Sequence, residues 1–488
     1  MSANNALPPI PVRVDWDDVT RVSRTTLTTH AWAAPPLRRS SPISERAFAA
    51  LRDLRADKAR FLSFWTHPHL GVPALHAPTE TGTSWDFAHL DPLLADFMTA
   101  AEGRPVVANL AAIPSWMFQD SAPELGTDPD ATIWDYEQGG PPRDESLTEI
   151  ADYFERIARW YIDGGFTDER GRRHVSDHDY RFAYWEVLCE PDVGHAWEPA
   201  AYTRLYDLVV QRLRGLDPDM RFVGLSLSPI TRNADYFWHF LDPANHAPGI
   251  SVDAVSHHFY ASPALGNAVG TEGNAPFDTW PATFFAQADG FLDKVELVES
   301  IKRRLSPHTE THINEIGSFA PDVMAAEPDI PEEYWALGGA VIAYLWSRLA
   351  DLGIELVGAA EFLGYPTVIP GVSLVDWKTG EPNARYRVLQ LLLDQFGPGD
   401  RLVTTSAGSE LAPEPPVHAQ GFQTGSGRRI LLVNRSTESV TVDLADAGRP
   451  ERVTVVDTGT GDGPARTSVT EGSVVVLGPC ATAVVALA

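Results

Sequence analysis

The sequence predicts a (β/α)8 barrel, a TIM barrel, followed by a small all-β sandwich domain, and three observations carry this prediction. The chain has 488 residues, which suits a barrel of roughly 250 to 400 residues plus one small domain. Eight short apolar β-type runs alternate with helical patterns up to residue 396, as in βα units that close on a parallel sheet. After residue 397, only β-type segments remain, separated by Gly, Pro, Asp and Ser.

Most of the predicted barrel strands are continuous apolar runs, which is typical of a parallel sheet buried on both faces. This pattern excludes a simple sandwich for the region. No Gly-rich dinucleotide-binding motif follows the first strand to favour a doubly wound sheet instead. The eight strands are expected over 24–30, 59–65, 105–113, 181–188, 221–227, 252–260, 312–317 and 355–363.

Helical spacing of apolar residues fills the intervals between these strands. In 199–216, for example, leucine and valine recur every three or four positions. The helices are expected over 86–101, 147–163, 199–216, 234–241, 284–305, 332–351 and 384–396.

Three segments follow from this pattern. The barrel is expected over 24–396 and the β-sandwich over 397–488. Within 1–23, the residues VRVDW at 12–16 are expected to add a strand to the β-domain, which would bring the chain ends together.

Composition excludes several classes of partner. The 66 acidic residues outnumber the 38 basic ones, which gives a net charge of -28. Nucleic acid phosphates and anionic membrane surfaces repel such a protein, so neither is an expected partner. The first residues lack the basic and apolar regions of a secretion signal, so a cytoplasmic location is expected. Association into a homo-oligomer stays open.

Two glutamates stand at predicted strand ends, where barrel enzymes place their chemistry. Glu190 follows the fourth strand, 181–188, and Glu315 lies near the end of the seventh, 312–317, so the two nearly face each other across the barrel mouth. Glycosidic cleavage needs one protonated and one ionised carboxyl group, and a separation of about 5 to 5.5 Å specifies retention of configuration. A lone glutamate at a strand end is more often a salt-bridge or solvent-facing residue, but the pair favours catalysis.

Several segments resemble clan A glycoside hydrolases. WEVLCEPD at 185–192 resembles the E-x-W-N-E-P motif of the clan, and HINEIGS at 312–318 resembles its strand-seven nucleophile motif. Within the clan, the chain is most similar to family 39, which contains β-xylosidases and α-L-iduronidases. The segments that resemble this family are DAVSHHFY at 253–260, WDFAHLDPLLADF at 85–97 and WKTGEPNARYRVLQLL at 377–392.

The resemblance implies that Glu190 is the general acid/base and Glu315 the nucleophile. His258 and Tyr260 would bind the sugar or support the nucleophile. The implied enzyme is a β-xylosidase-like, retaining glycosidase that acts on oligosaccharides or glycosides and needs no cofactor. No metal site is expected either, because the adjacent His257 and His258 point to opposite faces of a strand and no third ligand is suitably spaced.

The chain departs from the clan's motif beside the acid/base. Cys189 and Leu188 stand where asparagine and tryptophan are usual, and a thiol cannot replace an amide that binds the sugar 2-hydroxyl. Either the substrate differs at position 2, or another side chain such as Asn314 makes the contact, or catalysis is impaired. The last alternative would leave a non-catalytic carbohydrate-binding barrel.

Four further residues near strand ends are candidate substrate contacts. Trp65, Trp116 and Trp377 could each stack on a sugar ring or pack into the core. Glu361 could bind a hydroxyl group or an amine, or form a salt bridge.

Long loops at 120–144 and 262–280 follow the third and sixth strands. Long barrel loops tend to be functional. We expect these two to wall a pocket for one terminal sugar, which makes the enzyme exo-acting.

Overall fold

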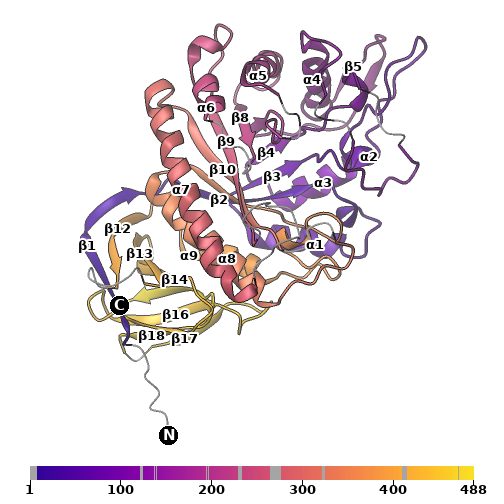
Figure 1. Cartoon of the computed structure of the whole chain (residues 1–488). Helices are drawn as coiled ribbons and strands as arrows, with labels where there is room; N and C mark the ends of the chain where they lie inside the picture. The colour runs from indigo at the N-terminus through magenta and orange to yellow at the C-terminus, as the bar shows by residue number, and fades with distance from the viewer. Residues whose placement is uncertain are drawn as a thin grey trace.

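The structure is a computed structural model of the chain. It describes residues 8–488 except 121–124, 137, 139, 194, 196, 229–233, 264–275, 321–324, 409–414 and 471. Figure 1 shows two parts, a barrel surrounded by helices and a β-domain packed beside helices α8, Glu333–Leu352, and α9, Ala384–Gln395. No helix of the described residues is both long enough and apolar enough to cross a membrane.

Eight parallel strands close into a barrel in the order β10-β11-β2-β3-β4-β7-β8-β9, which confirms the predicted fold. Every predicted strand is present, although several begin or end at other residues than expected. Their bounds are β2 Thr26–Trp32, β3 Lys58–Leu62, β4 Val106–Asn109, β7 Tyr184–Glu186, β8 Arg221–Leu227, β9 Ala254–Ala261, β10 Glu310–Ser318 and β11 Leu356–Ala359.

The helices surround this barrel and bury one face against it. The sequence analysis assigned none between the first two strands, yet α1 forms there and buries Ala47, Phe48, Leu51 and Leu54. The α-helices are α1 Ser44–Leu54, α2 Pro68–Gly71, α3 Leu90–Ala101, α4 Thr148–Ile162, α5 Pro199–Leu213, α6 Asp235–Phe240, α7 Trp280–Leu305, α8 Glu333–Leu352 and α9 Ala384–Gln395.

Smaller elements decorate the barrel. A hairpin of β5 and β6, which the sequence analysis did not predict, follows α4, and short 3-10 helices lie in the loops. Their bounds are β5 Gly165–Thr167, β6 Arg173–Val175, η1 Pro35–Leu37, η2 Ser115–Met117, η3 Pro243–Asn245, η4 Phe277–Thr279 and η5 Pro370–Val372.

The β-domain is a nine-stranded sheet with its own core of valine, leucine and isoleucine. The N-terminal strand β1, Ile10–Val22, belongs to it, since β1 pairs antiparallel with β12 and parallel with β15. Figure 1 accordingly shows β1 and the C-terminus at this domain. Its other strands are β12 Arg401–Ala407, β13 Val417–Thr424, β14 Gly427–Asn434, β15 Val440–Asp443, β16 Pro450–Val456, β17 Arg466–Val469, β18 Val474–Leu477 and β19 Thr482–Leu487.

Aromatic rings join the two parts. Phe422 of the β-domain lies 4.5 Å from the ring of Phe396 and 5.6 Å from that of Trp346 on α8, measured between centroids. Phe422 is completely buried. The joint is therefore apolar and closely packed.

Candidate active site

Glu190 lies beyond the end of its strand. The strand predicted over 181–188 ends at Glu186, because Leu188 and Glu190 adopt left-handed backbone conformations with φ of 64° and 50°. Such conformations are rare for residues with side chains and occur where the surroundings enforce them. The Glu190 amide donates a 2.9 Å hydrogen bond to the carbonyl of Ser226, which holds this turn against the end of β8.

Glu315 lies inside β10 rather than at its end, since that strand continues to Ser318. The pairing of β10 with β9 shifts register between His312 and Glu315. An irregularity of this kind bends a strand and re-aims its side chains. After the shift, Glu315 pairs with His258 of β9.

His258 connects the two glutamates. Its Nδ1 atom lies 2.9 Å from Glu190 Oε1 and 3.3 Å from Glu315 Oε2. The two carboxylate oxygens can therefore be no farther apart than the sum of these distances. On the other side of the ring, Nε2 lies 3.0 Å from Ser226 Oγ, which fixes the orientation of the imidazole.

Glu315 is held by two further groups. The Tyr260 hydroxyl donates a 2.7 Å hydrogen bond to Oε2, and Arg60 Nη1 donates one of 2.7 Å to Oε1. Sequence reasoning missed Arg60, although a charged residue inside the apolar run ARFLSFW was a usable signal. Arg60 is fully buried and also donates through Nε to Glu186 Oε2 at 2.7 Å.

Glu186 is the anchor of a buried polar network that the sequence analysis also missed. Besides Arg60, three side chains donate to its carboxylate: Asn109 at 2.6 Å, Ser256 at 2.7 Å and Asn314 at 2.7 Å. The predicted contact residue Asn314 thus uses its amide nitrogen on Glu186, and its Oδ1 has no hydrogen-bond partner among the described residues.

The two glutamates have opposite pKa shifts. Burial raises the pKa of Glu190, and the nearby His258 opposes this without cancelling it. Burial alone would raise the pKa of Glu315 too, but His258, Arg60 and His30 hold it well below its usual range. Glu190 can therefore keep a proton while Glu315 is ionised, which is the division of roles that acid/base chemistry with two carboxyl groups needs.

Glu361 follows β11 and contacts His30 at the end of β2. His30 Nε2 pairs with Glu361 Oε1, and His30 Nδ1 lies 3.3 Å from Arg60 Nη1. Burial raises the pKa of Glu361, and His30 opposes that shift. The other oxygen, Oε2, is buried without a partner in the part of the chain that the structure describes. Glu361 thus contacts His30 through one oxygen, and its second oxygen is not used by the described side chains.

Cys189 lies beside the nucleophile candidate. Its sulfur is 3.8 Å from both Glu315 Oε1 and Arg60 Nη2. Burial raises the pKa of this thiol well above its ordinary value, so the sulfur is neutral rather than a thiolate. The side chain packs in an apolar cluster with Trp32, Leu62, Ala111 and Val368, beside Phe64 and Tyr365.

The three candidate tryptophans are engaged elsewhere. Trp116 donates a 2.7 Å hydrogen bond to a backbone carbonyl, and the Arg143 guanidinium covers its ring at 4.4 Å. Trp65 packs on Phe64 at 4.3 Å, and Trp377 faces another indole at 6.5 Å. Among the described contacts, none joins these indoles to either glutamate.

An aromatic group that the sequence analysis did not single out is nearer to Cys189. Trp32 follows His30 on β2, and its ring lies 4.7 Å from Phe64 and 6.4 Å from Tyr365. Trp32 is fully buried, whereas Phe64 and Tyr365 are half-buried, so only the latter two rings have a face on which a sugar could stack.

Within the described part of the chain, two groups of side chains could offer ligands to a metal ion, Cys189 with His258 and Glu315, and His30 with Glu315 and Glu361. Both share Glu315, whose Oε1 already accepts from Arg60 at 2.7 Å. A second cation there would meet the fixed guanidinium charge. Electrostatics therefore favours Arg60 as the counter-charge of Glu315.

The predicted long loops are described only in part, because 121–124, 137, 139 and 264–275 lie outside the described residues. In the first loop, Trp134 donates to the carbonyl of Thr367 at 3.2 Å, which connects it to the loop after β11.

Comparisons with solved structures support the fold. The chain is similar to the GH51 arabinofuranosidase from Xanthomonas axonopodis pv. citri, with 11% identity, a TM-score of 0.66 and coverage of 98% of this chain and 100% of the other. For the α-L-arabinofuranosidase from Thermotoga maritima, the identity is 12% and the TM-score 0.63, with 98% of this chain and 99% of the other covered. For the GH30 endoxylanase from Clostridium papyrosolvens C71, the identity is 15% and the TM-score 0.55, with 98% of this chain and 100% of the other covered.

Comparisons by sequence give less. No curated protein matches the chain. Residues 415–485 match the family model described as D-apionate lactonase, C-terminal immunoglobulin-like domain. The solved structures from Xanthomonas axonopodis pv. citri and Clostridium papyrosolvens C71 are described as members of glycoside hydrolase families 51 and 30, and none of the three is described as a member of family 39.

Proposed function

We propose that this chain is a retaining glycoside hydrolase in which Glu190 is the general acid/base and Glu315 the nucleophile. The observation that carries the proposal is the position of His258 Nδ1, within 2.9 and 3.3 Å of the two carboxylates. The sum of these distances is the upper limit for the separation of Glu190 Oε1 and Glu315 Oε2, and it supports the about 5 to 5.5 Å of a retaining pair over the about 6.5 to 9.5 Å of an inverting pair, which must admit a water molecule. The geometry thus suits direct attack by a carboxylate.

In the first step, the ionised Glu315 attacks the anomeric carbon while Glu190 protonates the departing oxygen. The glycosyl–enzyme ester forms at Glu315 Oε1 or Oε2, and the aglycone leaves as an alcohol. In the second step, water attacks the anomeric carbon while Glu190, now ionised, takes a proton from it. The bond between that carbon and Glu315 breaks with a second inversion. The net result is retention of configuration.

Esterification of Glu315 removes the negative charge that faces Glu190. Because that charge helps to raise the pKa of Glu190, its loss makes Glu190 a better-ionised base for the second step. The same carboxyl group can therefore serve as acid and then as base.

The substrate that we propose is a terminal, xylose-like sugar of an oligosaccharide or small glycoside. Two of the similar structures are described as arabinofuranosidases and one as an endoxylanase, so pentosides are the first substrates to test. The half-buried rings of Phe64 and Tyr365 would contact the sugar, with Tyr260, His258 and Glu361 as polar neighbours. Exo action rests on the predicted loop walls and is tested by the products formed from xylo-oligosaccharides.

The decisive experiment follows the anomers released from aryl pentosides by NMR, with wild type, Glu315→Gln and Glu190→Gln. We expect retained product, a loss of activity in Glu315→Gln, and a pentosyl adduct on Glu315 in Glu190→Gln with an activated substrate. Glu145→Gln, at an exposed glutamate, is the matched control and should keep full activity. Inverted product, or an active Glu315→Gln enzyme, would refute the mechanism. Tight sugar binding without turnover would instead indicate a carbohydrate-binding barrel.

A second candidate is the hydrolysis of a sugar-acid lactone. It is favoured by the match of residues 415–485 to the C-terminal domain of D-apionate lactonase. A lactone ring opens to a carboxylic acid, so a pH-stat with pentonolactones measures this reaction directly. Proton release from lactones combined with inactivity on glycosides would select this function over the first.

A further inference from the structure

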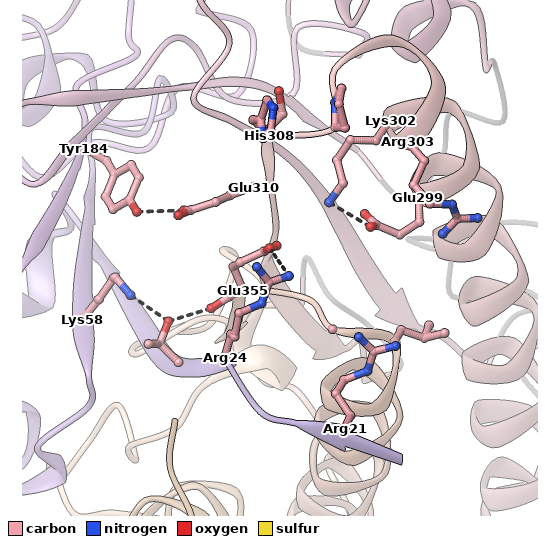
Figure 2. A pocket seen from close by; sticks show the side chains of 15 residues that line it. Arg21, Arg24, Lys58, Tyr184, Glu299, Lys302, Arg303, His308, Glu310 and Glu355 are labelled. Carbon is pink, nitrogen blue, oxygen red and sulfur yellow. Dashed lines mark hydrogen bonds and ion pairs between the residues drawn. The ribbon is translucent and has the colours of Figure 1, made fainter. Parts of the chain in front are cut away.

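A polar cavity of about 620 Å³ lies at the opposite end of the barrel from Glu190. Figure 2 shows it at the starts of the strands. Lys58, Tyr184 and Glu310 are the first residues of β3, β7 and β10, and all three line it. Pockets for small organic molecules have volumes of about 300 to 1,000 Å³. The cavity is therefore large enough for such a molecule.

Three glutamates line the cavity, and each already has a cationic partner. These ion pairs account for all of the lining carboxylates. They are Glu299 with Lys302 at 2.8 Å, Glu310 with Arg221 at 2.7 Å and Glu355 with Arg24 at 2.9 Å.

Three further cations line the cavity without a carboxylate partner among the described residues: Arg21, Lys58 and Arg303. Lys58 Nζ donates to the Thr26 hydroxyl at 2.8 Å, and Arg303 Nη2 donates to that of Ser300 at 2.8 Å. Arg21 Nε donates to a backbone carbonyl. An excess of positive charge therefore surrounds this cavity in a protein whose net charge is -28.

The lysine is the least exposed of these three cations. Burial lowers the pKa of Lys58, and Arg221 lowers it further, against the opposing effect of Asp57 and Glu310. A bound anion would stabilise the charged form of Lys58, because its negative charge replaces the interactions with water that burial removes.

We propose that this cavity binds a small, multiply charged organic oxyanion, such as a phosphate ester or a polycarboxylate, between Lys58, Arg21 and Arg303. Guanidinium groups bind the oxygens of phosphate and carboxylate in pairs, and an ammonium group adds a point charge. The paired glutamates and the Tyr184 hydroxyl also line the cavity, and they would contact the uncharged parts of the ligand. This site is separate from the proposed catalytic centre and does not depend on its function.

The test is isothermal titration calorimetry of the full chain with glucose 6-phosphate, inorganic phosphate and citrate as probes, and with glucose and chloride as negative controls. We expect binding of at least one oxyanion. Lys58→Gln and Arg303→Gln should each weaken it about tenfold or more, as expected when a hydrogen bond to a charged group is lost.

Arg304→Gln is the matched control, because Arg304 is the next residue on α7 and does not line the cavity. It removes the same charge and should leave the affinity nearly unchanged. Arg303 is exposed, so its substitution tests the site even if Lys58→Gln fails to fold. Stronger binding of glucose 6-phosphate than of citrate identifies a phosphate ligand, and the reverse order identifies a polycarboxylate. No binding of any oxyanion, or an equal loss in Arg303→Gln and Arg304→Gln, would overturn the proposal.

Discussion

Replacement of Arg60 by leucine is expected to destabilise the protein strongly and in a pH-dependent way. Arg60 is fully buried between Glu186 and Glu315 and lies 2.7 Å from a carboxylate oxygen of each. The variant leaves both carboxylates buried without their guanidinium partner. Breaking a buried ion pair by removing one partner costs about 3 to 5 kcal/mol of unfolding free energy. We expect a loss of this size at pH 7, measured by urea denaturation.

The sign of the pH dependence follows from the pKa shifts. In the wild type, the pKa values of Glu186 and Glu315 are lowered, against the effect of burial, with Arg60 a major cause for both. Their contribution to stability is therefore present above the pKa of an unfolded glutamate and is lost as the pH falls through the folded-state values. Without Arg60, the effect of burial is opposed less, so both pKa values rise relative to the wild type and protonation relieves part of the cost. The difference between variant and wild type should shrink from pH 7 to pH 5.

Arg39→Leu provides the control for this experiment. Arg39 pairs with Asp96 at 2.8 Å, but its side chain is 64% exposed, and exposed pairs contribute only about 0 to 1 kcal/mol. If Arg60→Leu costs no more than Arg39→Leu, or if its penalty grows toward pH 5, the view of Arg60 as the counter-charge of two ionised carboxylates is wrong.

Three further predictions concern single side chains. His258→Asn should move both limbs of the pH profile of kcat/KM to higher pH, because His258 lowers the pKa of Glu190 and of Glu315; an unchanged profile on aryl pentosides would contradict this. Cys189→Asn should raise kcat/KM for a substrate with a 2-hydroxyl group relative to its 2-deoxy analogue, because the new amide can bind that hydroxyl group. An unchanged ratio of the two kcat/KM values would show that residue 189 does not contact the 2-position of the substrate. Phe422→Ala should lower the free energy of unfolding by about 3 to 5 kcal/mol, because it leaves a cavity between the barrel and the β-domain. Calorimetry should then show either a lower melting temperature or separate melting of the two parts. A wild-type melting curve would refute the packing argument.

The sequence was sufficient to predict the barrel because most of its strands are apolar runs of the right length, bounded by turn residues or helices. The same apolar runs hide the residues that hold the site together. Arg60 interrupts one run and Glu186 another, and the spacing of apolar residues does not predict that the two side chains form an ion pair. Only the closure of the barrel shows that the two charges meet.

Backbone irregularities explain the errors at the strand ends. The register shift in β10 and the left-handed turn at Leu188 and Glu190 place both carboxyl groups beside His258. Neither feature has a glycine or proline at the critical residue to announce it. Bulges and strained turns depend on the neighbouring strands, so they cannot be derived from the local sequence.

The environment of Cys189 narrows the question of how a sugar would be recognised at its 2-position. The candidate substitute, Asn314, already donates its amide nitrogen to Glu186 at 2.7 Å. Cys189 itself offers a neutral thiol and faces Trp32 and Tyr365 on its apolar side. Two amides that could bind a hydroxyl group, those of Asn314 and Asn109, thus hold a buried carboxylate instead. Among the described residues of this site, the oxygens left without a hydrogen-bond partner are the amide oxygens of Asn314 and Asn109 and Glu361 Oε2, which lies on the far side of His30. If a sugar binds here, we expect its hydroxyl groups to donate to these oxygens, because the amide NH2 groups that the clan's motif would offer are already used on Glu186.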